Sequence, residues 1–127
     1  MTSIFSKIIA GEIPSYKVYE DEYVYAFLDI NPIQKGHTLV VPRKEIDYLF
    51  NYDQDTYARI MERVQFVAQL LKEKLVCARV CMIVEGYNVP HAHIHLIPTN
   101  KPDDLDKNLA HSATKEELEE AHSIITS

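Results

Sequence analysis

Three histidines alternate with apolar residues at His91, His93 and His95. On an extended strand every second side chain shares a face, so the three imidazoles would project together while the apolar residues between them enter the core. Imidazole changes charge near neutral pH and can act as a nucleophile, a general base or a metal ligand. The spacing therefore predicts a site of chemistry on a well-anchored strand.

Three interpretations of this pattern compete. Surface polarity on an edge strand is the least favoured, because it does not require strict alternation. A metal site needs three ligands that converge on one point, which same-face positions on one strand reach only with help from elsewhere. The third interpretation is attack on phosphorus by a neutral imidazole, while its neighbours donate hydrogen bonds to phosphate oxygens.

Other segments offer groups that a phosphate site needs. Gly86–Pro90 leads into the histidine strand and could place backbone amides near an anion. His37 opens another predicted strand, directly after a glycine. Asp29 ends a strand, where its carboxylate could accept hydrogen bonds from the hydroxyls of a sugar. The alternative for Asp29 is a turn-forming role ahead of Asn31–Pro32.

The elements that position these groups follow from hydrophobic periodicity. Apolar residues recur at steps of three and four over residues 53–75, which predicts a long amphipathic helix capped by Asp53 or Asp55. Short helices are predicted over residues 3–10 and 115–124, the second capped by Thr114. Strands are predicted over residues 16–20, 23–29, 37–42, 78–84 and 91–97, with Pro98 ending the last. Strands around one long helix indicate an α+β domain with a mostly antiparallel sheet.

Length and composition narrow the classes of protein. The 127 residues predict one domain over 1–127, with a core over 1–100 and a tail over 101–127 that contains a short helix. The net charge is −6, so the chain lacks the excess of basic residues that is typical of a nucleic-acid binder. No apolar run is long enough to cross a membrane. Two cysteines, Cys77 and Cys81, without a secretory signal predict free, buried thiols in the cytoplasm.

The segment His91–Pro98 resembles the signature of the histidine triad (HIT) family, in which three histidines alternate with apolar residues and two further apolar residues follow. Upstream segments are similar to that family in the same order, over Ile4–Pro14, Tyr19–Glu22, Ala26–Pro32 and Gly36–Lys44. The resemblance extends from about Ile4 to Pro98. It is strongest to the Hint-like branch of nucleotide hydrolases and phosphoramidases.

This resemblance implies a five-stranded antiparallel sheet with one long and one or two short helices. It also implies a homodimer built through residues 53–75 and 78–84. By position, His93 is the nucleophile that attacks the α-phosphorus of a purine nucleoside monophosphate joined to a leaving group. The nucleotidyl-histidine is then hydrolysed by water. His95 would hold a phosphate oxygen, and His91 and His37 would complete and orient the cluster.

The same resemblance assigns the nucleoside contacts. Asp29 would accept the ribose hydroxyls with Ile30 beside it. Phe5, Ile8 and Phe27 would line a slot for the base, and membership of the ordinary core is an equal alternative for these three. His111 and His122 lie in the tail, which in this family can reach the partner's site; a solvated helix face is the favoured interpretation for both.

Two departures from the family pattern change the expectations. The loop before the triad is short: Gly86 matches the glycine, but Tyr87 and Asn88 stand where the family has Gln and a Ser or Thr that bind phosphate and protonate the leaving group. Asn88 can donate a hydrogen bond but is a poor proton donor. Ser3, Ser6 and Glu45 stand where many bacterial members have two cysteines and a histidine that bind structural zinc, so no structural zinc and no cofactor are expected.

The sequence therefore predicts a hydrolase that cleaves the P–N bond of a purine nucleoside 5′-phosphoramidate. Hydrolysis of a dinucleoside polyphosphate is the alternative within enzymes. A nucleotide-binding regulatory module with weak catalysis is the alternative outside them.

Overall fold

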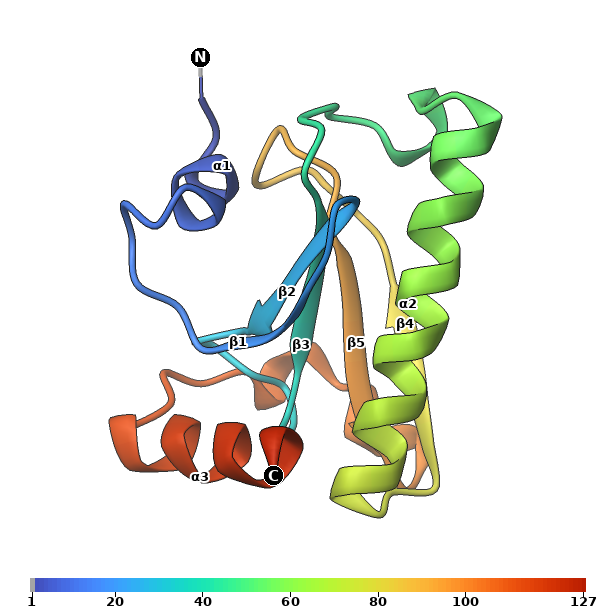
Figure 1. The fold of residues 1–127 in the computed structure, drawn as a ribbon. Coiled ribbons are helices and arrows are strands. Elements are labelled where there is room, and N and C mark those ends of the chain that lie inside the picture. The colour runs from blue at the N-terminus through green and yellow to red at the C-terminus, as the bar shows by residue number, and fades with distance from the viewer. Residues whose placement is uncertain (1) are drawn as a thin grey trace.

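The computed structural model describes residues 2–127 and contains a five-stranded antiparallel sheet packed with helices (Figure 1). The strands are β1 (Lys17–Glu20), β2 (Val24–Leu28), β3 (Thr38–Pro42), β4 (Arg79–Ile83) and β5 (Ile94–Thr99). The α-helices are α1 (Ile4–Ile9), α2 (Gln54–Leu75) and α3 (Lys115–Thr126). Short 3-10 helices occupy Leu49–Asn51, Pro102–Leu105 and Lys107–Leu109. The predicted α+β class and five-stranded sheet are confirmed.

The strand order β1-β2-β3-β5-β4 decides which loops meet. β5 returns between β3 and β4, and every neighbouring pair of strands is antiparallel. Within the β3–β5 pair, Leu39 lies opposite His95 and Thr38 lies opposite Leu96. The residue before β3, His37, is thereby brought beside the middle of β5.

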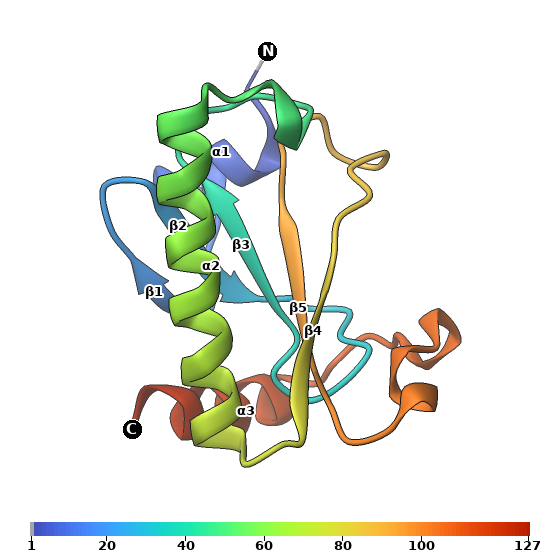
Figure 2. The same ribbon diagram turned by 90° about the vertical axis from the view of Figure 1, so that its right-hand side faces the viewer.

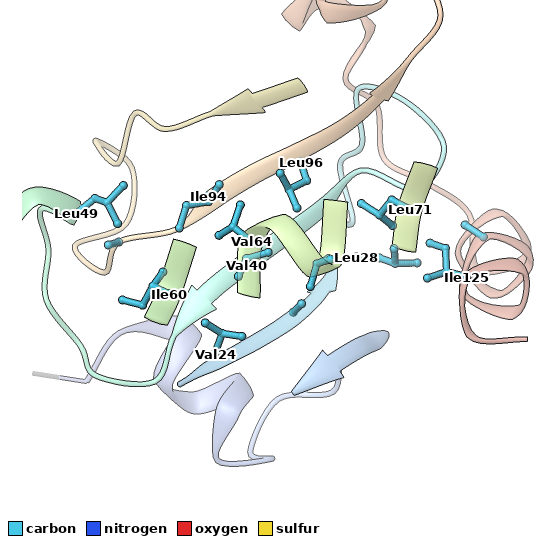
Figure 3. Packing of buried hydrophobic residues seen from close by; sticks show 14 of the residues in the cluster. Val24, Leu28, Val40, Leu49, Ile60, Val64, Leu71, Ile94, Leu96 and Ile125 are labelled. Atoms are coloured by element: carbon cyan, nitrogen blue, oxygen red, sulfur yellow. The ribbon is translucent and has the colours of Figure 1, made fainter. Parts of the chain in front are cut away.

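The main core lies between one face of the sheet and the helices α2 and α3 (Figure 3). Alternate residues of β2 and β5, such as Val24 and Ile94, point into it because side chains alternate across a strand. The helical members are Ile60, Val64, Val67, Leu71, Leu118, Ala121 and Ile125. Each fully buried aliphatic side chain contributes about 1.5–3 kcal/mol. The tail helix α3 therefore belongs to the core that anchors β5.

A second, smaller cluster lies on the opposite face of the sheet. Its members are Phe5 and Ile8 of α1 with Phe27, Leu39 and Val41 of the strands. Phe27 stands between Ala26 and Leu28, which belong to the main core, so it must point the other way. The loop between β4 and β5 and the 3-10 helices of the tail project from the side of the sheet away from α2 (Figure 2).

Several details differ from the sequence prediction. The strand predicted over 91–97 begins at Ile94 and runs to Thr99, so His91 and His93 precede it and Pro98 does not end it. The Ala92 N–H donates to the carbonyl of Ile46 rather than to a strand. Pro98 pairs in register with Val80 beyond the last β3 partner, so its missing N–H falls where one neighbouring strand has already ended.

The helix caps agree with the prediction, whereas two burial predictions were wrong. Asp53, rather than Asp55, caps α2, and Thr114 caps α3 with a capping box. Cys77 and Cys81 are half-buried instead of buried. Ile4 of α1 is exposed, because only the Phe5 and Ile8 positions of this helix meet the sheet. None of the helices in residues 2–127 is long and apolar enough to span a membrane.

One backbone position leads to a stability prediction. Val76, which ends α2, has φ 53° and ψ 49° and is 85% exposed. A left-handed conformation costs an L-residue about 1–2 kcal/mol, and glycine avoids that cost while losing about 0.5–1 kcal/mol of chain entropy. We expect Val76→Gly to raise the free energy of unfolding by about 0.5–1 kcal/mol, measured by urea denaturation. Val76→Ala, which keeps a Cβ, is the control, and a lower midpoint for Val76→Gly would contradict the argument.

Candidate active site

Four histidines and one aspartate lie along β5 and the adjoining ends of β2 and β3. His37 precedes β3, His91 and His93 precede β5, and His95 lies within β5. Three of the rings are almost completely buried, with exposures of 3% for His37, 0% for His91 and 1% for His93. The structure thus brings together the four histidines predicted from the sequence, although they do not project as one row from a strand.

The first hydrogen-bond chain determines which nitrogen of His95 carries a proton. The Ile33 N–H donates to His37 Nδ1 at 3.0 Å, so the single proton of neutral His37 sits on Nε2. His37 Nε2 lies 3.0 Å from His95 Nδ1 and donates to it. His95 Nδ1 therefore acts as an acceptor, and His95 presents an N–H at Nε2. This group is suited to hold a phosphate oxygen.

The second chain ends at His93. His91 Nε2 lies 2.7 Å from the carbonyl of Pro42 and must donate to it, because a carbonyl only accepts. His93 Nδ1 lies 2.8 Å from the carbonyl of His91 and donates for the same reason. The neutral His93 ring is left with a lone pair on Nε2. All fully buried side-chain nitrogen and oxygen atoms in residues 2–127 have hydrogen-bond partners, so this unpartnered nitrogen reaches the surface.

The lone pair and the donor are neighbours. The ring centroids of His93 and His95 are 5.1 Å apart, and those of His37 and His95 are 5.2 Å apart. A nucleophilic nitrogen next to an N–H donor is the pair of groups that transfer of a phosphoryl group needs.

Burial favours the neutral form of His37, His91 and His95. Burial lowers the pKa of His37 and that of His91 below the usual 6.5. The carboxylate of Asp29 raises the pKa of His37, and that of Glu45 raises the pKa of His91, but each offsets the effect of burial only partly. Burial, with the neighbouring rings of His37 and His93, lowers the pKa of His95 to about 4. Because these pKa values are lowered, the tautomers assigned to His37, His91 and His95 hold at neutral pH.

Asp29 has two different oxygens. Its Oδ1 accepts the Asn31 N–H at 2.8 Å, which is the turn-forming role considered for this residue. Its Oδ2 lies 3.5 Å from His37 Nε2 and 4.0 Å from His95 Nδ1. One carboxylate therefore serves the turn and still presents an oxygen at the edge of the histidine cluster.

A cleft of about 390 Å³ opens beside His95. The charged residues that line it are Asp29, Glu85 and Lys107, and the last two form an ion pair. Lys107 comes from the tail, and neither it nor Glu85 carries a pattern in the sequence that predicts this position. The remaining lining residues are Asn31, Ile33, His37, Ile83, Tyr87, Asn88, Ile97 and Ala110.

The other predicted contacts lie at different depths. Asn88 and the 94% exposed Tyr87 line the cleft, and Gly86 turns the loop with φ +84°. Ile30 is 61% exposed next to Asp29.

The aromatic and aliphatic residues proposed for the base lie deeper. Phe5, Ile8 and Phe27 are buried in the second cluster and do not line the cleft, which agrees with the core alternative. Phe5 nevertheless meets the ring of His93 edgewise, with centroids 4.8 Å apart.

The two tail histidines serve the surface of the fold. His111 is exposed and faces Glu117, and His122 lies 2.7 Å from the carbonyl of Lys17, to which it donates. His111 precedes α3 instead of lying on it, and His122 lies on the α3 face that contacts Lys17.

Metal binding can be tested on the donor groups. Within residues 2–127, only Asp29, His37 and His95 place three ligand atoms within 4.8 Å of one another. His37 already accepts a hydrogen bond at Nδ1, so its one proton occupies the Nε2 that would have to bind the ion. At the position of the family's structural zinc, Ser3, Ser6, Glu45 and His91 form hydrogen bonds with one another and offer no thiolate. This donor set does not fit a structural zinc ion.

Comparisons with known proteins agree with this arrangement. A family model described as the HIT domain matches residues 10–102. An uncharacterized HIT-like protein of Methanocaldococcus jannaschii is 44% identical over 105 residues, which is 79% of this chain and 81% of that protein. The adenosine 5′-monophosphoramidase of Candida albicans is 37% identical over 107 residues, covering 75% and 68% of the two chains.

A solved structure matches the whole fold. The crystal structure of a Hit-like protein from Bartonella henselae, described as involved in cell-cycle regulation, superposes with a TM-score of 0.87 at 35% identity. The match covers 98% of this chain and 94% of that one.

The hydrogen-bond partners lead to a spectroscopic prediction. At neutral pH we expect ¹⁵N-resolved spectra to show His93 protonated on Nδ1, and His37, His91 and His95 protonated on Nε2. On acidification His95 should titrate with a midpoint of about 4, because charging its ring requires breaking the bond from His37 and placing a cation in a buried site. The exposed His111, whose pKa is raised by the Leu109 carbonyl and by Glu117, should titrate above 6.5 and is the internal control. An Nε2–H tautomer for His93 would contradict the assignment of its lone pair.

Proposed function

The chain belongs to the HIT family, and from this premise we propose that it is a hydrolase of purine nucleoside 5′-phosphoramidates that acts through a nucleotidyl-histidine intermediate. The observation that carries the proposal is the tautomer of His93. Its Nδ1–H is engaged by the His91 carbonyl at 2.8 Å, so the lone pair is on Nε2, and His93 lines a hollow at the surface. A relative, from Candida albicans, is named an adenosine 5′-monophosphoramidase.

The first step transfers the nucleotidyl group to the protein. The Nε2 lone pair of His93 forms a bond to the α-phosphorus as the bond from phosphorus to the leaving nitrogen breaks. That nitrogen departs with the electron pair and takes a proton from water. The His93 ring gains positive charge, which the carbonyl of His91 stabilises through Nδ1–H, while the Nε2–H of His95 stabilises the charge on a phosphate oxygen.

The second step releases the product. Water attacks the same phosphorus, the bond to His93 Nε2 breaks, and the electron pair returns to the ring. The water proton passes to solvent, and the nucleoside monophosphate leaves. The ring then recovers its Nδ1–H tautomer, because the His91 carbonyl still accepts that proton.

The charges of the cleft favour a neutral leaving group. Asp29 and Glu85 are negative and Lys107 is positive, while the buried histidines are neutral, so the fixed charges sum to about −1. A phosphoramidate loses an amine, which such a cleft accepts. A dinucleoside polyphosphate would have to bring several further negative charges into it, so that alternative is disfavoured.

The nucleoside would lie along the edge from Asp29. The Asp29 Oδ2 can accept the ribose hydroxyls, since only Oδ1 is occupied by the turn. The exposed side chain of Ile30 offers apolar surface beside it. Phe5 would take part chiefly through its edgewise contact with the His93 ring. Ile8 and Phe27 pack with Phe5 in the second cluster, and contact of the three with the base would require that cluster to open.

A homodimer accounts for an exposed apolar surface. Tyr48, Phe50, Met82 and Val84 are exposed by 57%, 64%, 53% and 39% and surround a hollow of about 560 Å³. This surface lies between the start of α2 and the unpaired edge of β4. A second copy packed against these four side chains would bury apolar surface that water otherwise surrounds, next to the hollow that His93 also lines.

Turnover of adenosine 5′-phosphoramidate tests the proposed chemistry. We expect the wild type to release AMP, with His93→Ala at least about 10³-fold slower because no lone pair replaces Nε2. Rapid quenching in alkali should trap an adenylated wild type and no adenylated His93→Ala. Chelation by EDTA should leave the rate unchanged.

The controls separate the alternatives. Replacement of the exposed His111 by Ala should leave turnover near the wild-type value. AMP binding by the wild type without turnover would support the nucleotide-binding module. Turnover that survives His93→Ala would reject His93 as the nucleophile, and faster turnover of a dinucleoside polyphosphate would favour the other hydrolase.

The dimer is tested by sedimentation equilibrium. We expect the wild type to be a dimer and Met82→Asp to be a monomer, because a charge at the centre of the apolar surface would have to be desolvated. Val76→Asp, on an exposed valine outside that surface, is the matched control and should remain a dimer. A monomeric wild type would contradict the proposal.

A further inference from the structure

A small polar cluster joins the N-terminal helix to the segment that carries the nucleophile. We call it the serine–carboxylate cluster, and it consists of Ser3, Ser6, Glu45 and His91. Ser3 Oγ lies 2.7 Å from His91 Nδ1, and Ser6 Oγ lies 2.6 Å from Glu45 Oε1. Ser3 and His91 are separated by 88 positions in the chain, so the cluster joins two distant segments.

Every bond in the cluster has one consistent direction. His91 Nε2 must donate to the Pro42 carbonyl, so its Nδ1 accepts the hydroxyl proton of Ser3. Ser3 Oγ in turn accepts the Ser6 N–H at 3.0 Å and caps α1. The Glu45 carboxylate accepts the Ser6 hydroxyl and the Ser3 N–H, and these bonds hold the pKa of Glu45 at about 2.

The carboxylate decides where the hydroxyl of Ser6 points. Ser6 Oγ lies 3.5 Å from His91 Nδ1, so it is a competing donor for the nitrogen that Ser3 occupies. As long as Glu45 accepts the Ser6 proton, Ser3 alone bonds to the ring. Without the carboxylate, the two serines would compete and the His91 ring would lose its single orientation.

Two contacts connect the His91 segment and α1 to the nucleophile. The carbonyl of His91 accepts the Nδ1–H of His93. Phe5, between the two serines on α1, meets the rings of His91 and His93 edgewise, with centroids 6.0 Å and 4.8 Å apart. The two segments that the cluster joins therefore both contact the ring of His93.

We propose that Ser3, Ser6 and Glu45 are positioning residues that act through His91 to fix the tautomer and the direction of His93. None of the three lines the cleft, so they act without contact with substrate. The kinetic part of this proposal rests on the proposed hydrolysis, whereas the spectroscopic and metal-binding parts do not.

The kinetic experiment compares substitutions at Glu45. We expect Glu45→Ala to lower kcat by about 10–100-fold with a smaller change in KM, as loss of an orienting partner does in other sites. Glu45→Gln keeps an oxygen that can accept from Ser6 and should stay within about threefold of wild type. Glu12→Ala removes an exposed carboxylate just beyond α1 and is the matched control.

A spectroscopic readout separates positioning from simple stabilisation. Glu45→Ala should show the His93 ring in a mixture of tautomers, whereas wild type and Glu45→Gln show Nδ1–H alone. A Glu45→Ala protein with a lower unfolding midpoint, wild-type kcat and an unchanged His93 tautomer would overturn the proposal, since the cluster would then only anchor α1.

A metal-binding variant tests, without any substrate, whether the four side chains of the cluster converge on one point. The Ser6 and Glu45 oxygens lie 3.5 Å and 3.7 Å from His91 Nδ1, and the two serine oxygens are 3.4 Å apart. Four ligands around zinc are separated by about 3.3–3.8 Å, given bonds of about 2.0–2.3 Å. The triple variant Ser3→Cys, Ser6→Cys, Glu45→His should therefore bind one zinc ion per chain, with His91 as the fourth ligand, and wild type should bind none.

The zinc bound by each protein is measured by atomic emission after dialysis. Addition of His91→Ala to the triple variant should weaken zinc binding by at least about tenfold, because only three ligands remain. A folded triple variant that takes up no zinc would show that the four side chains do not converge. Wild type that fails to hydrolyse the phosphoramidate would reject the proposed function but leave this result and the tautomer result intact.

Discussion

The site depends on one constraint: each buried imidazole has a fixed group at one nitrogen, and that group decides where the single proton of the ring must be. The Ile33 N–H leaves His37 no choice but Nε2–H, and the Pro42 carbonyl does the same for His91. The proton of His95 follows from that of His37, and the backbone carbonyl of His91 fixes the proton of His93 in the same way. The chemistry assigned to His93 thus depends on a backbone carbonyl, and the side chains that contact His91 hold that carbonyl in place.

The fold supplies those backbone groups by ending its regular structure early. Ladder bonding between β3 and β5 ends at Ile94, which frees the carbonyl of His91 to accept from His93. Had the strand continued to His91, as the alternation predicted, that carbonyl would face a neighbouring strand. The turn after Asp29 likewise brings the Ile33 N–H to His37. The main core beneath β5, which includes α3, holds these short irregular segments in place.

The sequence predicts the regular elements and the set of site residues better than it predicts their contacts. Periodicity located α2 and narrowed its cap to Asp53 or Asp55, and the residue pattern together with the resemblance singled out all four histidines and Asp29. Neither approach could show that the ring of His91 turns toward Ser3, because that bond joins residues 88 positions apart. Glu85 and Lys107 were missed for the same reason. Their pairing depends on where the tail packs, which local propensity does not contain.

The two polar systems around His93 respond differently to acid, and this difference sets the working range of the site. The Glu45 carboxylate has a pKa of about 2, so it stays charged and keeps its hydrogen bonds from Ser3 and Ser6 throughout the physiological range. The histidines are the weaker part. Burial lowers the pKa values of His37, His91 and His95 below those of the unfolded chain, so the unfolded state binds more protons as the pH falls below about 6.5. Stability from the neutral rings is complete above that pH and declines toward pH 4, where His95 itself becomes protonated. Acid therefore protonates His95, with a pKa of about 4, before it protonates the Glu45 carboxylate that accepts hydrogen bonds from Ser3 and Ser6 at the start of α1.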